Sequence, residues 1–169
     1  MTSPTSSRPA PDAPHELEAS PAERRALRLW VTLARAYGAV ARLSAADIAR
    51  HGLSPSEFAV LEALYHKGPL LQGQVQEKVL VSSGGITYLV DRLVERGLVE
   101  RRLCESDRRA RYAALTGAGE ALMADIFPDH AAAVRAAVGG LTAREQELAT
   151  ELLKRLGRRA AAAAEDAEG

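Results

Sequence analysis

The chain has 169 residues, of which 47% are hydrophobic, and its 22 basic side chains balance 22 acidic ones. This length suits a single domain with helical extensions, and a formal charge of zero removes net charge as an indication of a nucleic-acid partner. A single cysteine excludes an intrachain disulfide and no apolar run is long enough to cross a bilayer, so we expect a soluble, cytoplasmic protein with no membrane partner.

The N-terminal region predicts a tail followed by one long helix. Residues 1–19 contain four prolines and no apolar run, which indicates a flexible tail. Ser20, Pro21 and Glu23 then combine a capping side chain, a first-turn proline and a capping-box glutamate, the pattern with which helices begin. We therefore expect a helix over 20–50 with apolar residues along one side.

The same capping pattern opens the next helix. Ser54 and Glu57 stand three residues apart before an apolar run, and Gly68-Pro69 ends that run. A short helix over 71–79 is expected next. Because Leu71 stands where a capping hydroxyl is usual, this helix is predicted to depend on tertiary packing.

Residues 82–97 predict a two-sided helix. Ser82 supplies an N-cap, and Gly97 suits the left-handed conformation in which helices often end. One side is apolar and is formed by Ile86, Leu89, Val90 and Leu93. The other side carries small and polar residues, namely Ser83, Gly84, Gly85, Thr87, Tyr88 and Arg92. Small residues at a helix N-terminus allow close approach to phosphate, and hydroxyl groups suit contacts with base edges.

Two short strands with an arginine-rich connection follow this helix. Residues 98–103 and 110–115 predict a hairpin, and its tip ends in Asp107-Arg108-Arg109. A capped helix followed by such a hairpin is the order of elements in a winged helix-turn-helix, which lays one helix in the DNA major groove. Arginine suits phosphates, guanine edges and narrow minor grooves, so the hairpin is predicted to reach DNA as well.

Two further helices are expected after the hairpin. Thr116 caps the first, and Pro128 is expected to kink it or to mark a junction within it. Thr142 and Glu145 form a third capping box and open the last helix.

The segments outside the winged helix-turn-helix predict a dimer. A lobe over 54–115 folds without the helices of 20–50 and 116–164, whose apolar stripes this small core cannot cover. A second copy related by a twofold axis would cover them and would present two recognition helices to an inverted repeat. The alternative is a monomer in which the extra helices pack on its own core.

These motifs together resemble the MarR family of transcription regulators. The resemblance is carried by Gly68-Pro69-Leu70, by Ser82 to Gly97 as recognition helix, and by Asp107-Arg108-Arg109 followed by Leu115-Thr116-Gly117-Ala118-Gly119. It implies a mainly α fold with a small β-wing, in which the winged helix-turn-helix is flanked by N- and C-terminal dimerisation helices. It also implies that Asp107 orients Arg109 and that Arg109 enters the minor groove. The strings 82–88 and 104–107 further resemble the branch whose members respond to quinones and phenolic compounds.

We therefore interpret the chain as a regulator that binds double-stranded DNA sequence-specifically, and not as an enzyme. We expect a homodimeric repressor on a palindromic operator, released by a small aromatic or acidic effector and needing no cofactor or metal. HExxH, CxxC, GxSxG and P-loop patterns are absent from the sequence. The predicted DNA contacts are Ser82, Ser83, Gly84, Gly85, Thr87, Tyr88, Arg92, Arg101, Arg102, Asp107, Arg108 and Arg109. Of these, Arg92, Arg101 and Arg102 are expected mostly to hold phosphates. The alternative is a winged-helix protein-interaction module without specific DNA binding, whose arginines are merely solvated.

An effector pocket is predicted where the dimerisation helices meet the DNA-binding lobe. Its predicted walls and polar anchors are Trp30, Arg35, Tyr37, His51, Phe58, Tyr65 and Met123. The alternative is that these aromatic residues at helical spacing belong to the core. Cys104, beside the arginines of the hairpin, is interpreted as an ordinary surface thiol rather than a redox sensor.

Overall fold

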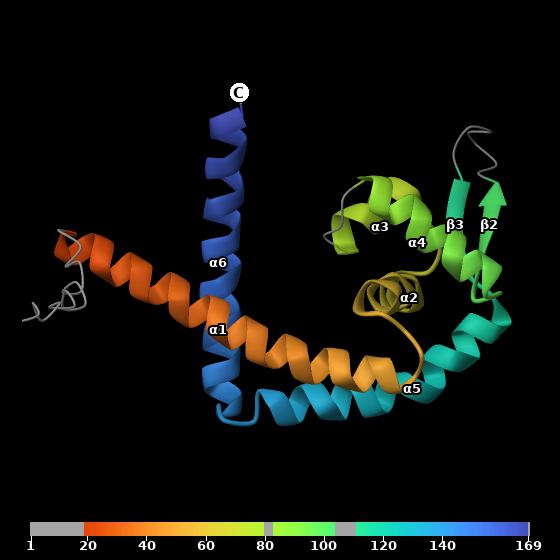
Figure 1. Cartoon of the computed structure of the whole chain (residues 1–169), viewed down its shortest axis with the longest axis horizontal. Coiled ribbons are helices and arrows are strands. Elements are labelled where there is room, and N and C mark those ends of the chain that lie inside the picture. Colours follow the sequence, from red (N-terminus) through yellow and green to blue (C-terminus); the bar gives the residue numbers. More distant parts are fainter. Residues whose placement is uncertain (1–18, 80–82, 104–110, 169) are drawn as a thin grey trace, which may run out of the picture. The chain divides into compact units, whose positions relative to one another are not determined.

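The computed structural model describes residues 19–79, 83–103 and 111–168, and it is mainly helical with a small sheet (Figure 1). Its elements are α1 (Pro21–Arg50), α2 (Pro55–Lys67), β1 (Leu70–Leu71), α3 (Gln72–Val79), α4 (Ser83–Glu95), β2 (Val99–Leu103), β3 (Arg111–Leu115), α5 (Gly117–Ala137) and α6 (Ala143–Glu168). The expected fold class, mainly α with a small β-wing, is confirmed. Predictions for the tail, Ser82, Cys104 and the hairpin tip 104–110 lie outside the described residues.

Contacts divide the chain into two units. The first ends at Tyr37, part-way along α1, and the second begins at Gly38 and contains all the other elements. The winged helix-turn-helix therefore lies entirely within the second unit. Among the residues that the structure describes, no helix has the length and apolarity needed to cross a membrane.

The predicted capping boxes are present. At the start of α2, the Glu57 amide donates to Ser54 Oγ at 3.2 Å, and the Ser54 amide donates to Glu57 Oε2 at 2.8 Å. The same reciprocal bonds join Ser20 to Glu23 and Thr142 to Glu145. Each pair satisfies amides that the first helical turn leaves without partners, and so each helix begins where its capping residue stands.

The helix α3 begins without a capping hydroxyl but is not left uncapped. The side-chain oxygen of Gln74 accepts a hydrogen bond from the Leu71 amide at 2.9 Å, which is half of a capping box. Leu70 and Leu71 also pair as β1 with Ala113 and Tyr112 of β3. The start of this helix is thus held by the sheet, in line with the expected dependence on tertiary packing.

The sheet is antiparallel, with the strand order β1-β3-β2. Val99 pairs with Leu115 and Leu103 pairs with Arg111, so β2 and β3 form the predicted hairpin, which we call the wing. In Figure 1 the two strands run side by side next to α3 and α4. The strand β1 was not predicted.

The turn from α4 into the wing is fixed by two local features. Gly97 has a φ of +70°, the left-handed conformation expected after the end of this helix. Thr116 caps α5, accepting from the Gly119 amide at 3.1 Å, and its hydroxyl donates to the Gly97 carbonyl at 2.7 Å. One side chain therefore joins the start of α5 to the end of the recognition helix.

Pro128 lies inside α5 without ending it. The helix continues to Ala137, so the predicted junction is absent, and Figure 1 shows its axis changing direction along its length. Proline removes one intrahelical hydrogen bond, which neighbouring turns can tolerate when the helix packs on a core. Here Met123 and Ile126 are both buried and hold the preceding turns against that core.

Candidate DNA interface

The recognition helix α4 has one buried and one exposed side, as predicted. Ile86, Val90 and Leu93 are buried in the core cluster. Thr87 is exposed, and 60% of the Tyr88 side chain is accessible. An exposed phenol on a helix that is held by its other side is accessible to an external partner.

Thr87 receives a contact that sequence reasoning missed. The Gln72 side-chain amide at the start of α3 donates to Thr87 Oγ1 at 2.5 Å. The two residues are 15 positions apart, on separate helices, and no local pattern marks them as partners. The contact adds Gln72 to the polar surface that α4 presents.

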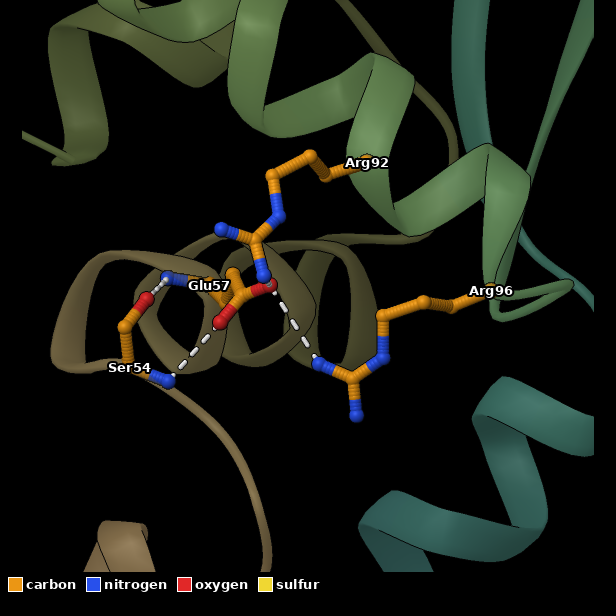
Figure 2. Close-up of polar contacts among 4 residues, drawn as sticks. All are labelled: Ser54, Glu57, Arg92 and Arg96. Atoms are coloured by element: carbon orange, nitrogen blue, oxygen red, sulfur yellow. Dashed lines mark hydrogen bonds and ion pairs between the residues drawn. The ribbon is translucent and has the colours of Figure 1, made fainter.

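A buried carboxylate joins the start of α2 to α4 (Figure 2). The Glu57 side chain is only 3% exposed, and one of its oxygens accepts from the Ser54 amide. The other oxygen, Oε1, lies 3.3 Å from a guanidinium nitrogen of Arg92 and 3.3 Å from one of Arg96. The recognition helix is therefore tied to α2 by charge as well as by apolar packing.

Burial alone raises the pKa of Glu57, because a low-dielectric environment disfavours the charged form. The hydrogen bonds from Ser54 and the charges of Arg92 and Arg96 outweigh burial, so the pKa of Glu57 lies below its ordinary value. The group is thus an anion at neutral pH, and its arginine contacts are ion pairs.

The arginines predicted to hold phosphates all have carboxylate partners in the chain. Arg92 pairs with Glu57, Arg101 with Asp91 at 2.6 Å, and Arg102 with Glu100 at 2.7 Å. The Arg102 pair could have been found from sequence, because residues two apart in a strand share a side. The Arg101 pair could not, because it joins β2 to α4. The Arg101 and Arg102 pairs have exposed carboxylates and are weak, so a phosphate can compete with them.

The other predicted DNA contacts are placed only in part. Ser83 and Gly84 lie in the first turn of α4, and Gly85 is half-buried there. Ser82, Asp107, Arg108 and Arg109 lie outside the described residues, so their contacts remain predictions.

The predicted effector-pocket residues of the second unit lie in different surroundings. Phe58 and Met123 belong to the core cluster, which is the alternative to a pocket that the sequence left open for such residues. Trp30, Arg35 and Tyr37 are exposed and lie in the first unit. Tyr65 lines a cavity of about 500 Å³ between the end of α2, the wing and the start of α5. His51 is half-buried, and its Nε2 atom is buried without a hydrogen-bond partner in the described part of the chain.

A second cavity lies beside a buried polar contact. It measures about 350 Å³ and is lined by Glu62, Phe127, His130, Ala131, Val134, Arg135, Val138 and Gln146. His130 Nδ1 lies 3.0 Å from Asp47 Oδ2, and Arg50 pairs with the other oxygen of the same carboxylate. Asp47 belongs to α1 and His130 to α5, so one wall of this cavity is connected to the C-terminal end of α1.

We expect the free energy of unfolding to fall as the pH is lowered below about 5. Burial raises the pKa of Asp47, but its hydrogen bonds with His130 and Arg50 and their charges outweigh burial, so the pKa of Asp47, like that of Glu57, is lowered. A lowered pKa stabilises the folded state above the unfolded pKa, and this contribution is lost as the pH falls through the folded one. Urea unfolding at a series of pH values measures the effect. Asp47→Asn and Glu57→Gln should each flatten the dependence, and an unaltered slope in both variants would contradict the assignment.

A family model described as MarR family matches residues 51–110. The HTH-type transcriptional regulator MhqR of Bacillus subtilis (strain 168) is 44% identical over 133 residues, which cover 79% of this chain and 92% of the relative. The chain belongs to the MarR family. Members of this family are DNA-binding transcriptional regulators and not enzymes, so the MarR-type chain described here is a transcriptional regulator.

Solved structures share the fold of this chain. A MarR family regulator from Streptomyces coelicolor in complex with DNA has a TM-score of 0.73 and 24% identity, covering 85% of this chain and 91% of its own. BpsR of Bordetella bronchiseptica has a TM-score of 0.69 and 25% identity, covering 77% of this chain and 98% of its own. DNA binding by BpsR is regulated by 6-hydroxynicotinic acid. Among the described residues of this MarR-family chain, no cluster of three or more metal-ligating side chains occurs.

Proposed function

We propose that this MarR-family protein is a homodimeric repressor that binds a palindromic operator and is released by a small aromatic or acidic effector. The observation that carries the proposal is the exposed side of α4, with Thr87 and Tyr88 presented by a helix whose opposite side is buried. Ser82 to Gly85 would approach phosphate at the helix N-terminus, while Thr87 and Tyr88 would contact base edges. Arg109, oriented by Asp107 and with Arg108 beside it, would enter the minor groove.

Exposed apolar side chains support the dimer. On α1 they are Leu27, Leu29, Trp30, Val31 and Leu43, and on α6 they are Leu148, Leu152, Leu153 and Leu156. Rows of exposed apolar side chains as long as these are unfavourable in water. A second copy of the chain, related by a twofold axis, would cover them. The two recognition helices would then read half-sites about 10 bp apart, or a multiple of that spacing.

The cavity beside His130 supports effector control. Its lining combines apolar side chains such as Phe127 and Val134 with polar groups, the composition of a site for a small aromatic ligand. Because His130 contacts Asp47 of α1, a ligand in this cavity could shift the C-terminal end of α1. We propose that this helix is part of the dimer interface. Such a ligand releases DNA only if it binds one spacing of the recognition helices more tightly than the other.

Binding to the DNA immediately upstream of its own gene tests the proposal. Fluorescence anisotropy at 50 and 200 mM salt should show tight binding to an inverted repeat and a loss of affinity of about a thousandfold or more between the two salt concentrations. The expectation rests on the release of counterions by several phosphate contacts. Weak binding without sequence preference, at an affinity that salt does not change, would instead favour the protein-interaction module.

Filling the cavity beside His130 should abolish release without weakening DNA binding. Ala131 is exposed at the cavity wall, so Ala131→Phe can place a ring in the cavity without displacing the core. We expect at least a tenfold higher concentration of hydroquinone, catechol or benzoate, whichever releases the wild-type protein, to be needed for release. Ala132→Phe is the matched control, since Ala132 is the exposed neighbour in the same helix. Equal sensitivity of the wild-type and Ala131→Phe proteins would exclude this cavity as the effector site.

A further inference from the structure

Arg92 contacts both a buried carboxylate and an exposed aromatic ring. Its guanidinium lies 3.3 Å from Glu57 Oε1 and 5.8 Å from the centroid of the Tyr88 ring, one turn earlier in α4. Glu57 is almost fully buried, whereas Tyr88 is largely exposed. Arg92 therefore connects a fixed point in the interior to a side chain on the outer side of the recognition helix.

We propose that Arg92 is a positioning residue that holds the Tyr88 ring for reading bases, and that it does not act as the phosphate contact expected from sequence. The inference rests on the proposed reading of DNA by α4 and assigns a determinant of sequence specificity within that surface.

The anchoring of Glu57 separates Arg92 from the other arginines near the interface. Glu57 is 3% exposed, and its carboxylate is held by the Ser54 amide and by the arginines of α4 and its end (Figure 2). The partners of Arg101 and Arg102 are exposed carboxylates, Asp91 and Glu100, with accessible fractions of 48% and 47%. A carboxylate on the surface gives way to a phosphate at little cost, because water solvates it. Glu57 is only 3% exposed, so if Arg92 left, its charge would depend on Arg96 and the Ser54 amide alone, in a place with little water to replace the lost partner. Arg92 is thus the arginine of the three that is least free to leave for DNA.

The contact with Tyr88 has a physical benefit for recognition. A guanidinium near an aromatic face is attracted by the ring quadrupole, and residues four apart on a helix are neighbours. An exposed tyrosine otherwise samples several rotamers and loses that freedom on binding. A ring already held by Arg92 contacts its base pair with a smaller entropic loss, so discrimination between base pairs increases.

The two possible roles of Arg92 differ in what they change. A phosphate contact adds about 0.9 to the slope of log affinity against log salt and contributes equally at every sequence. A positioning residue leaves that slope unchanged and acts only where Tyr88 reads, so its effect disappears when the tyrosine is removed.

A double-mutant cycle measures this difference. The DNA is a duplex selected by the full-length wild-type protein from a randomised library, together with each single base-pair substitution of its half-site. Wild type, Arg92→Ala, Tyr88→Ala and the double variant are titrated by anisotropy over a series of salt concentrations. At the base pair where Tyr88→Ala lowers discrimination, we expect Arg92→Ala to lower it about three- to tenfold. We expect no further loss from Arg92→Ala in the Tyr88→Ala background and an unchanged salt slope.

Two further variants and a stability measurement test whether the effect of Arg92 on discrimination acts through the Tyr88 ring. Arg92→Lys retains a cation that the ring still attracts but lacks the planar guanidinium, so it should lose less discrimination than Arg92→Ala. Arg96→Ala removes an ion pair to the same Glu57 oxygen at the same distance, but residue 96 lies two turns, about 12 Å, beyond Tyr88. It should therefore leave discrimination unchanged. Thermal unfolding of each variant confirms that the lobe is folded under the conditions of the assay.

Three results would overturn the inference. A salt slope lowered in Arg92→Ala, with the same loss in both Tyr88 backgrounds, would make Arg92 a phosphate contact and leave the proposed function intact. An equal loss of discrimination in Arg96→Ala would assign the effect to the attachment of α4 rather than to the ring. Unchanged discrimination at every base pair in Tyr88→Ala would remove Tyr88 from base reading, and with it this part of the proposed function.

Discussion

Gly119→Ala is expected to cost about 3 kcal/mol of folding free energy, or to prevent folding, because there is no room for a methyl group. A Cβ atom at this position would lie 2.1 Å from the Leu98 carbonyl oxygen and 3.2 Å from Cδ2 of Leu115. The Leu98 oxygen is backbone and also accepts a hydrogen bond from the Thr116 amide at 3.1 Å. Moving it away would break the contact between the end of the recognition helix and the start of α5.

Gly117→Ala is the matched control for this prediction. Gly117 lies in the same first turn of α5, and a Cβ atom there would meet no atom within 4 Å. Alanine should stabilise the protein by about 0.5–1 kcal/mol, because it reduces the freedom of the unfolded chain and favours the helix. Urea unfolding of both variants measures the difference. If Gly119→Ala were as stable as Gly117→Ala, α5 would not approach the Leu98 carbonyl as closely as the structure has it.

Leu152→Glu is expected to convert the proposed dimer to a monomer and to lower operator affinity by a factor of about 100 or more. Leu152 lies with Leu148 and Leu156 at four-residue spacing along α6, where each side chain is exposed in the isolated chain. A carboxylate in the centre of this stripe would be buried without a partner if two copies associate. Without the dimer, each half-site is bound separately, and the gain from two linked contacts is lost.

Size-exclusion chromatography with light scattering and anisotropy on the two-half-site duplex test this prediction together. Thr150→Glu is the control, because it adds the same charge to an exposed position two residues away, on the opposite side of the helix. It should stay dimeric with unchanged affinity. Leu152 is 46% exposed in one chain and lies outside the core cluster, so Leu152→Glu should remain folded, which urea unfolding of both variants checks. A dimeric Leu152→Glu protein would mean that α6 lies outside the interface.

The features that follow from neighbouring residues were predicted correctly. Ser54 and Glu57 cap α2, and Thr116 caps α5 as expected. The apolar spacing of Ile86 and Val90 correctly separated the buried from the exposed side of α4. Capping and periodicity act within one or two helical turns, so the information is present in a short stretch of chain.

Other features depend on packing and are not visible in a short stretch of sequence. A two-residue strand such as β1 has no periodicity to recognise, and it exists because β3 lies beside it. Helical spacing does not show which aromatic residues line a cavity, since Phe58 is in the core whereas Tyr65 lines the cavity beside the wing. The effector pocket itself stays a prediction. Of the two outcomes expected at Pro128, the junction is absent because α5 continues through it, and the axis of the helix bends instead (Figure 1).

Local sequence decided where the helices begin and which side of α4 faces outward, because those properties need only a few consecutive residues. The tertiary structure decided which charges meet. Glu57 pairs with Arg96 across 39 positions, and Asp47 contacts His130 across 83. The energy of an ion pair depends on distance and burial, and both are set only when separate helices pack together. Nothing in the residues around Glu57 marks Arg92 as its partner. The series of contacts that runs from Ser54 through Glu57 and Arg92 to Tyr88 is therefore visible only in the folded protein.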